Sequence, residues 1–258
     1  GLTRDLHPLD NTHAERTKEK RCARCGTTLF LLCLRTGQGD FLSVRASGKR
    51  NIMTSLRKIF ASVCRLRQSL GFGVHSPYIY ALLTDVFRER LPYYAYEAIG
   101  QLPGESPYSS GSFKINRLLF RLVNRFLPDS IIETGDSDGR SLKSMSLARK
   151  DAVCRNIPDG RGFSTEELKQ TLGNSRQLDF LFISSTNAFR EAFEAALPLT
   201  GEHSVFIILS IHADKDRRMW WKAVEHDERT GFTVDLYDIG LVFFDRNHPR
   251  RNYRITYC

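Results

Sequence analysis

The sequence predicts an α/β fold in which a mostly parallel, doubly wound sheet ends in an antiparallel C-terminal hairpin and is preceded by N-terminal helices. Three observations lead to this prediction. Strand-like and helical segments alternate from residue 130 onward, the central strands are almost entirely apolar, and the last two long strand-like segments follow each other directly. Such alternation is typical of parallel sheets covered by helices on both faces, whereas a short turn joins antiparallel strands.

Composition and charge limit the classes of protein and partner. The 258 residues are 41% hydrophobic, which is enough for one large domain and an appendage. The longest apolar runs, at 29–34 and 205–209, are too short to span a bilayer. The net charge of +9 lies wholly in residues 1–90. We therefore expect a cytoplasmic protein with no membrane partner and no specific nucleic-acid partner, although the basic segment 54–70 could contact an anionic surface.

The first fifty residues differ from the rest of the chain. Residues 1–52 show no sustained periodicity, so we expect a disordered leader or upstream sequence outside the native protein, with Met53 as the true start. Cys22 and Cys25 form half of a zinc knuckle, and the sequence has no second knuckle. The six cysteines are scattered, which indicates reduced thiols rather than a disulfide framework.

Residues 53–128 are predicted to form a helical region. Apolar residues recur at helical spacing over 54–70, 78–90 and 113–127, and a further helical stretch follows Pro92. Apolar stripes of this length must be buried, either against the sheet or against a second copy in a homodimer.

Residues 129–258 are predicted to form the α/β domain. Strands are expected at 130–134, 152–157, 178–184, 203–210, 232–238 and 240–245, with a last edge strand at 252–256. Helices are expected at 139–150, 164–172, 187–197 and 214–228. Ser164 and Glu167 have the spacing of a capping box. The strand at 131–134 should be central, next to 178–184, and 240–244 should be antiparallel to its neighbours.

The stretch IIETGDSDG at 131–139 is the candidate functional motif. A β-branched strand runs into an acid and then into two glycines four residues apart. Strands that end at nucleotide sites have this form, because glycines let a ligand approach and the next helix offers its N-terminus to an anion. An ordinary strand-turn-helix junction with an incidental Glu133 has the same form.

Several segments resemble the class I S-adenosylmethionine-dependent methyltransferases, whose sheet is Rossmann-like. The resemblance is closest to a bacterial group of methyltransferase-like proteins related to small-molecule O-methyltransferases. It covers most of 71–255, and its most specific part is the C-terminal segment. The resembling segments are 71–87, 114–128, 131–142, 178–184 and 210–255.

The resemblance implies S-adenosylmethionine as cofactor and a small-molecule methyl acceptor. It places Glu133 near the methionine ammonium, and it places Gly135, Asp136 and Gly139 in the cofactor turn. Asp159 would be the acid that holds the ribose hydroxyls. Because Asp159 follows Pro158 in a Pro-Asp-Gly turn, a plain turn residue is at least as good an interpretation.

The sequence departs from the family pattern in ways that bear on activity. The 20 residues 158–177 are too few for the helix, third strand and loop that would hold adenine. The acids with which some members bind a metal are replaced by Ser184 and Leu209–Ser210, so no metal site is predicted. His212 is a weak candidate for the catalytic base, and a loop histidine that caps the helix at 214 is the favoured alternative. We expect a shortened methyltransferase with weakened activity, or else a non-catalytic binding or scaffold protein.

Overall fold

The computed structural model describes residues 76–101, 113–135, 138–159, 163–173, 177–184 and 186–257. The predicted helix at 54–70, the Cys-x-x-Cys motif and Asp136 lie outside these ranges. The domain boundaries at 52/53 and 128/129 remain predictions. In the described part of the chain, no helix is both long and apolar enough to cross a membrane.

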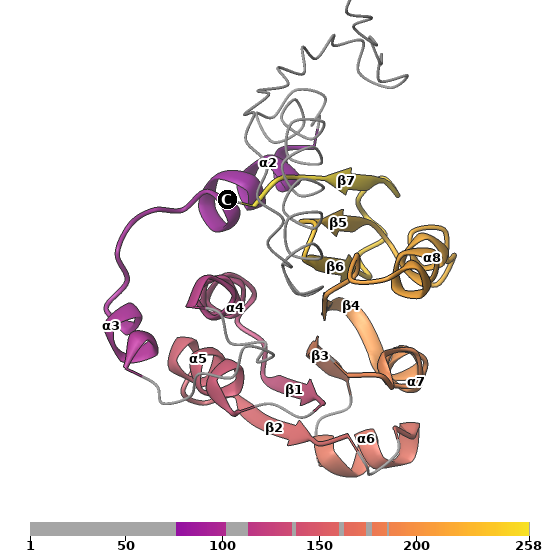
Figure 1. Ribbon diagram of the computed structural model, residues 1–258, viewed down its shortest axis with the longest axis horizontal. Coiled ribbons are helices and arrows are strands. Elements are labelled where there is room, and N and C mark those ends of the chain that lie inside the picture. Colours follow the sequence, from indigo (N-terminus) through magenta and orange to yellow (C-terminus); the bar gives the residue numbers. More distant parts are fainter. Residues whose placement is uncertain are drawn as a thin grey trace, which may run out of the picture. The chain divides into compact units, whose positions relative to one another are not determined.

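The strands form one seven-stranded sheet with the order β2-β1-β3-β4-β6-β5-β7 (Figure 1). Strands β1 to β4 pair in parallel, β6 is antiparallel to both β4 and β5, and β7 pairs in parallel with β5 at the edge. The predicted fold class, the internal place of β1 beside β3 and the antiparallel strand near 240–244 are therefore confirmed, and β1 is the second strand from the β2 edge. The strand bounds are β1 Ser130–Thr134, β2 Val153–Ile157, β3 Leu178–Ile183, β4 Thr200–Leu209, β5 Thr233–Asp235, β6 Ile239–Phe243 and β7 Asn252–Arg254.

The helices largely follow the predicted pattern. Ser164 caps α6 by accepting a hydrogen bond from the Glu167 backbone N–H at 3.1 Å, which confirms the capping box. Helix α8 ends earlier than predicted, because the chain tightens into turns after Val224 before it enters β5. The bounds are α2 Pro77–Leu82 with a π-helical continuation Leu83–Phe87, α3 Ala95–Gly100, α4 Phe113–Phe126, α5 Arg140–Ala148, α6 Thr165–Leu172, α7 Phe189–Ala196 and α8 Lys215–Val224.

Side-chain alternation along the strands builds two hydrophobic cores, one on each face of the sheet. Ile131 and Phe182 face the core that includes residues of α2, α4 and α5, whereas Ile132 and Leu181 face the core under α6, α7 and α8 (Figure 1). Alternation also sends Glu133 to the same face as Ile131. The side chain of Glu133 therefore points towards the face covered by α4 and α5.

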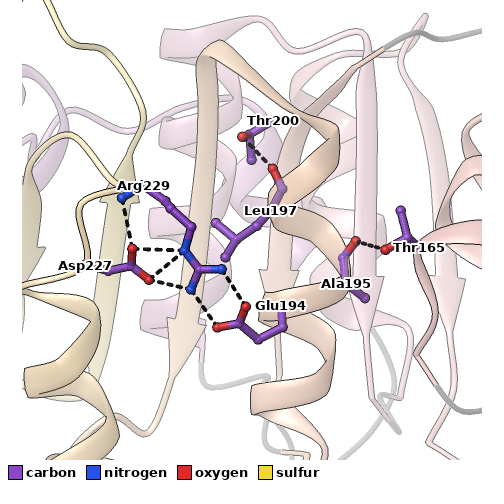
Figure 2. Close-up of polar contacts among 7 residues, drawn as sticks. All are labelled: Thr165, Glu194, Ala195, Leu197, Thr200, Asp227 and Arg229. Carbon is purple, nitrogen blue, oxygen red and sulfur yellow. Dashed lines mark hydrogen bonds and ion pairs between the residues drawn. The ribbon is translucent and has the colours of Figure 1, made fainter.

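The C-terminal end of α7 is held by a polar network (Figure 2). Arg229 donates to both carboxylate oxygens of Glu194 at 2.7 and 2.9 Å, and to Asp227 Oδ2 at 2.6 Å. Thr165 donates to the Ala195 carbonyl at 2.9 Å. Hydrogen bonding from Arg229 lowers the pKa of Asp227 below its ordinary value, although burial opposes this. Because α7 returns from the carboxyl end of β3, this network lies at the opposite end of the sheet from the candidate site.

This network predicts a pH-dependent contribution to stability. The folded-state pKa of Asp227 is lowered, so its contribution is present above the ordinary carboxyl pKa and is lost as the pH falls through the folded value. Because Arg229 is half exposed, Asp227→Asn should cost only about 0.2–1 kcal/mol at neutral pH. Urea unfolding at a series of pH values should show the mutant and wild-type stabilities converging in acid.

The neighbouring exposed carboxylate of Glu228 supplies the control. Glu228→Gln leaves the contacts of Arg229 with Asp227 and Glu194 in place, so it should leave the stability curve unchanged. A stability difference for Asp227→Asn that stays constant down to strongly acidic pH would contradict the proposed role of the ion pair.

Candidate functional site

The candidate site lies at the carboxyl ends of the parallel strands. The chain passes from β1 to β2 on one side of β1, and later places β3 on its other side. In open α/β sheets, ligands bind outside the carboxyl ends of the strands at such a reversal of strand order. At this edge, Gly135, Ser184 and Ser210 directly follow β1, β3 and β4, and Asp159 lies two residues after β2.

Glu133 is fully buried near the end of β1. One of its carboxylate oxygens accepts a hydrogen bond from Ser141 Oγ at 2.5 Å, and Ser141 lies in the first turn of α5. This contact joins the strand to the helix across the predicted cofactor turn. Glu133 therefore links the end of β1 to the first turn of α5 from the buried side of the turn.

Gly135 is needed for close packing between β1 and the end of β3. Its φ is 106°, and its backbone N–H donates to the Ile157 carbonyl at 2.9 Å. A Cβ at this position would lie 2.3 Å from Ser184 Oγ, which itself donates to the Thr134 carbonyl at 2.7 Å. Ser184 thus occupies the space that the missing side chain leaves.

Gly139 begins α5 and is open to a ligand. It has a left-handed φ of 77°, and among the described residues no atom lies within 4 Å of a Cβ built there. The first turn of α5 starts here, so its backbone N–H groups point towards the carboxyl edge. The Arg140 N–H at this end of the helix donates to Asp138 Oδ1 at 3.1 Å, so a carboxylate of the protein itself already lies at the α5 N-terminus.

Asp159 is brought to the end of β3 and not left in an isolated turn. Its carboxylate accepts a hydrogen bond from Thr186 Oγ1, and the same hydroxyl oxygen accepts from the Ala188 N–H at 3.0 Å. Thr186 is buried, whereas Asp159 is half-buried. The contact ties the segment after β2 to the loop before α7, and it holds the candidate ribose acid at the correct edge of the sheet.

No strand pairs with the outer edge of β2 within the described ranges, so β2 lies at the margin of the sheet. The described residues between β2 and β3 form one helix, α6. This arrangement agrees with the sequence-based expectation that the third strand of the family plan is missing.

Arg217 fills part of the same edge between β3 and β4. It donates to the Leu209 carbonyl at 3.1 Å and also to the Thr186 carbonyl, and its guanidinium lies 4.3 Å from the centre of the Phe189 ring. Burial lowers the pKa of Arg217, and the charges of Asp214 and Asp216 oppose that effect. No local sequence pattern marks Arg217, because its hydrogen-bond partners here are backbone carbonyls.

The structure corrects the favoured interpretation of His212. The N-cap of α8 is Asp214, which accepts from the Arg217 N–H at 2.7 Å, so His212 does not cap this helix. Instead, His212 Nε2 lies 2.9 Å from Oδ2 of the buried Asp235. Asp235 was also missed, although an acid inside the apolar segment FTVDLYD was a usable signal, because a buried carboxylate requires a partner.

The predicted site residues therefore fall into two groups. Glu133, Gly135 and Gly139 surround the β1–α5 turn, and Asp159 reaches the adjacent β3 end through Thr186. His212 follows β4 and belongs to a separate pair with Asp235. In the described part of the chain, no three His, Cys, Asp or Glu residues gather as metal ligands would.

Comparison with known proteins gives structural likeness alone. No family model and no curated protein matches the chain. Among solved structures, the O-methyltransferase TomG from Streptomyces achromogenes, crystallised with SAM, is 16% identical over 63% of this chain and 96% of that chain, with a TM-score of 0.41. The SAH-bound methyltransferase PaMTH1 from Podospora anserina is 10% identical over 81% and 100%, with a TM-score of 0.43. At such scores, the fold assignment rests on the strand order.

The packing at Gly135 predicts a specific stability defect. Gly135→Ala should destabilise the protein by about 1–3 kcal/mol through overpacking against Ser184, in addition to the strain of a positive φ. Gly139→Ala carries positive-φ strain without this clash and is the matched control. Urea unfolding should show the larger loss for Gly135→Ala and partial recovery when Ser184→Ala is added. Equal losses in the two glycine variants would contradict this account.

Proposed function

We propose that this chain is a shortened class I methyltransferase of the O-methyltransferase-like kind, which binds S-adenosylmethionine at the β1–α5 turn and serves a small-molecule acceptor. One observation carries the proposal. The central strand ends at the reversal of strand order in a turn with positive-φ glycines, and that turn opens onto the N-terminus of α5. This is the position and backbone form that α/β folds use for nucleotide-like ligands.

The amino-acid end of the cofactor fits the residues present. Open space at Gly139 beside the N-terminus of α5 suits a carboxylate, which would compete with Asp138 for the Arg140 N–H. The buried carboxyl group of Glu133 would suit a nearby ammonium group, as an ion pair in a partly dry cleft. When bound, S-adenosylmethionine supplies an activated methyl group, and the chain contributes binding and orientation of the two reactants.

The adenosine end of the cofactor fits the residues present less well than the amino-acid end does. Asp159 is the candidate partner of the ribose hydroxyls, but its carboxylate already accepts from Thr186. Among the described residues, no strand pairs with the outer edge of β2 to form a wall for the adenine. Losing a charged hydrogen bond to the ribose costs roughly 1.5–3 kcal/mol, or about ten- to a hundredfold in affinity. We therefore propose weak cofactor binding and slow transfer.

Contacts at the same carboxyl edge of the sheet support a second candidate function. Ser184 packs directly against Gly135, and Arg217 spans the carboxyl ends of β3 and β4. These contacts fill space near the site with the protein's own groups. They favour a non-catalytic methyltransferase-fold protein that binds a partner or ligand without transferring a methyl group.

Calorimetric titration of the full chain with S-adenosylmethionine and with S-adenosylhomocysteine tests the proposal. We expect saturable binding that is weaker than micromolar. Gly139→Ala should weaken it by about tenfold or more, because a Cβ would enter the space that the ligand uses. Gly173→Ala is the matched control, because Gly173 also has a positive φ and open space but ends α6.

The outcomes separate the two candidate functions. Binding that is lost in Gly139→Ala and retained in Gly173→Ala supports the cofactor site. No binding of either compound by the wild-type protein favours the non-catalytic function. Micromolar or tighter binding would contradict the weakened adenosine end.

A further inference from the structure

A cavity of about 500 Å³ lies between the start of α2 and the segment that leads into β7. Its lining includes prolines, aromatic rings and an arginine, namely Pro77, Tyr78, His248, Pro249, Arg251 and Tyr253. Small-molecule sites have volumes of this order, and they are lined mainly by apolar and aromatic side chains with a few polar groups. The proposed methyltransferase function gives this cavity no role.

The cavity is far from the β1–α5 turn. Strands β3, β4, β6 and β5 lie between β1 and β7 in the sheet. Five strand spacings amount to roughly 24 Å. The segment that carries His248 and Arg251 enters β7 at its first residue, Asn252, and so lies at the start of that strand. A small ligand in the cavity therefore does not reach a cofactor bound at the turn.

The aromatic rings of the wall pack around one buried ring, that of Phe232. Its ring centre lies 5.8 Å from that of Tyr78, 5.9 Å from that of His248 and 6.4 Å from that of Tyr253. The Tyr78 and His248 rings lie 4.3 Å apart. These rings come from α2, from the segment before β7 and from β7 itself, so tertiary packing sets the shape of the wall before any ligand arrives.

The orientation of the His248 ring is fixed by a carboxylate. Its Nδ1 lies 2.7 Å from Asp245 Oδ2, and Asp245 Oδ1 accepts the Asn247 backbone N–H at 2.8 Å. Both oxygens of Asp245 are thus engaged, and this residue is not part of the cavity lining. Asp245 therefore holds the imidazole in the wall and does not present an oxygen to the cavity.

Tyr253 brings a polar group to this largely apolar wall. The residue is only 5% exposed, yet its hydroxyl has no hydrogen-bond partner among the described residues. The hydroxyl oxygen is also not one of the side-chain atoms that are sealed from solvent without a partner. Buried hydroxyl groups nearly always have a partner, so this one is the exception that needs an explanation. Because Tyr253 lines the cavity, its hydroxyl is available to a ligand there.

The charged groups at the cavity favour an anion. Arg251 is exposed and forms no ion pair within the described part of the chain. It precedes Tyr253 by two residues at the entry to β7, and in an extended chain such side chains lie on the same side. Burial raises the pKa of Tyr78, and the positive charge of Arg125 opposes that effect, so a second guanidinium lies near this wall. A guanidinium beside a hydroxyl donor suits a carboxylate.

We propose that this cavity is a second ligand site, which binds a small aromatic carboxylate. The ligand ring packs against Tyr78, His248 and the two prolines, and its carboxylate accepts hydrogen bonds from the Arg251 guanidinium and the Tyr253 hydroxyl. One guanidinium and one neutral donor match a single negative charge better than the double charge of a phosphate. The site is independent of the cofactor turn, so the proposal stands whether or not the protein transfers methyl groups.

Ligand-observed nuclear magnetic resonance titration of the full chain with benzoate tests the site. We expect saturable binding of benzoate, and binding that is weaker by about tenfold or more for benzamide, which has the ring without the charge, and for acetate, which has the charge without the ring. Arg251→Gln should weaken benzoate binding by about tenfold. Tyr253→Phe removes only the hydroxyl and should weaken it severalfold. Absence of saturable benzoate binding at millimolar concentrations would overturn the proposal.

The chain offers a matched control in the preceding residue. Arg250 is also exposed but is not part of the cavity lining, so Arg250→Gln should leave benzoate binding unchanged. Equal losses in Arg250→Gln and Arg251→Gln would indicate general charge attraction and overturn the assigned site. Benzamide binding as tight as that of benzoate would overturn the carboxylate class. S-adenosylhomocysteine should not displace benzoate, and displacement would place benzoate at the β1–α5 turn and refute a separate site.

Discussion

The burial of β1 on both faces is the constraint on which the rest of the structure depends. Ile131 packs into one core and Ile132 into the other, and β2 and β3 pair with β1 on its two sides. A strand confined in this way cannot slip by one residue without exchanging its two faces. Its register therefore determines where Glu133 points and where Gly135 leaves the sheet, and so it sets the geometry of the whole carboxyl edge.

At that edge, most polar groups meet another group of the protein. Glu133 accepts from Ser141, Asp159 accepts from Thr186, and Arg217 is bound to backbone carbonyls. Buried polar groups have to be satisfied in this way, because leaving one unpaired costs about 1–3 kcal/mol. A ligand that uses these groups must replace existing hydrogen bonds. This exchange, together with the lack of a strand beyond β2 among the described residues, is the physical basis for the weak binding that we propose for the adenosine end.

The two ends of the sheet differ in how their polar groups are held. At the amino end, Arg229 joins α7 to the segment after α8 through the exposed carboxylate of Glu194 and the partly buried carboxylate of Asp227, an arrangement that stabilises modestly and tolerates water (Figure 2). At the carboxyl end, a strained loop holds His212 against a buried acid. Strain and buried polar groups both lower stability, and the surrounding packing has to compensate for them at this edge.

The sequence by itself determined the elements, their order and much of the sheet. Apolar periodicity predicted the helix at 113–127, the capping box predicted the helix at 164–172, and the short interval between residues 157 and 178 indicated the missing strand. These signals are local, because side-chain periodicity reflects the geometry of a single helix or strand. Only the tertiary structure showed that Ser184 fills the space beside Gly135, that Thr186 binds Asp159, and that Asp235 holds His212. Each of these pairs joins residues more than twenty positions apart, which meet only after strand pairing and register have been set.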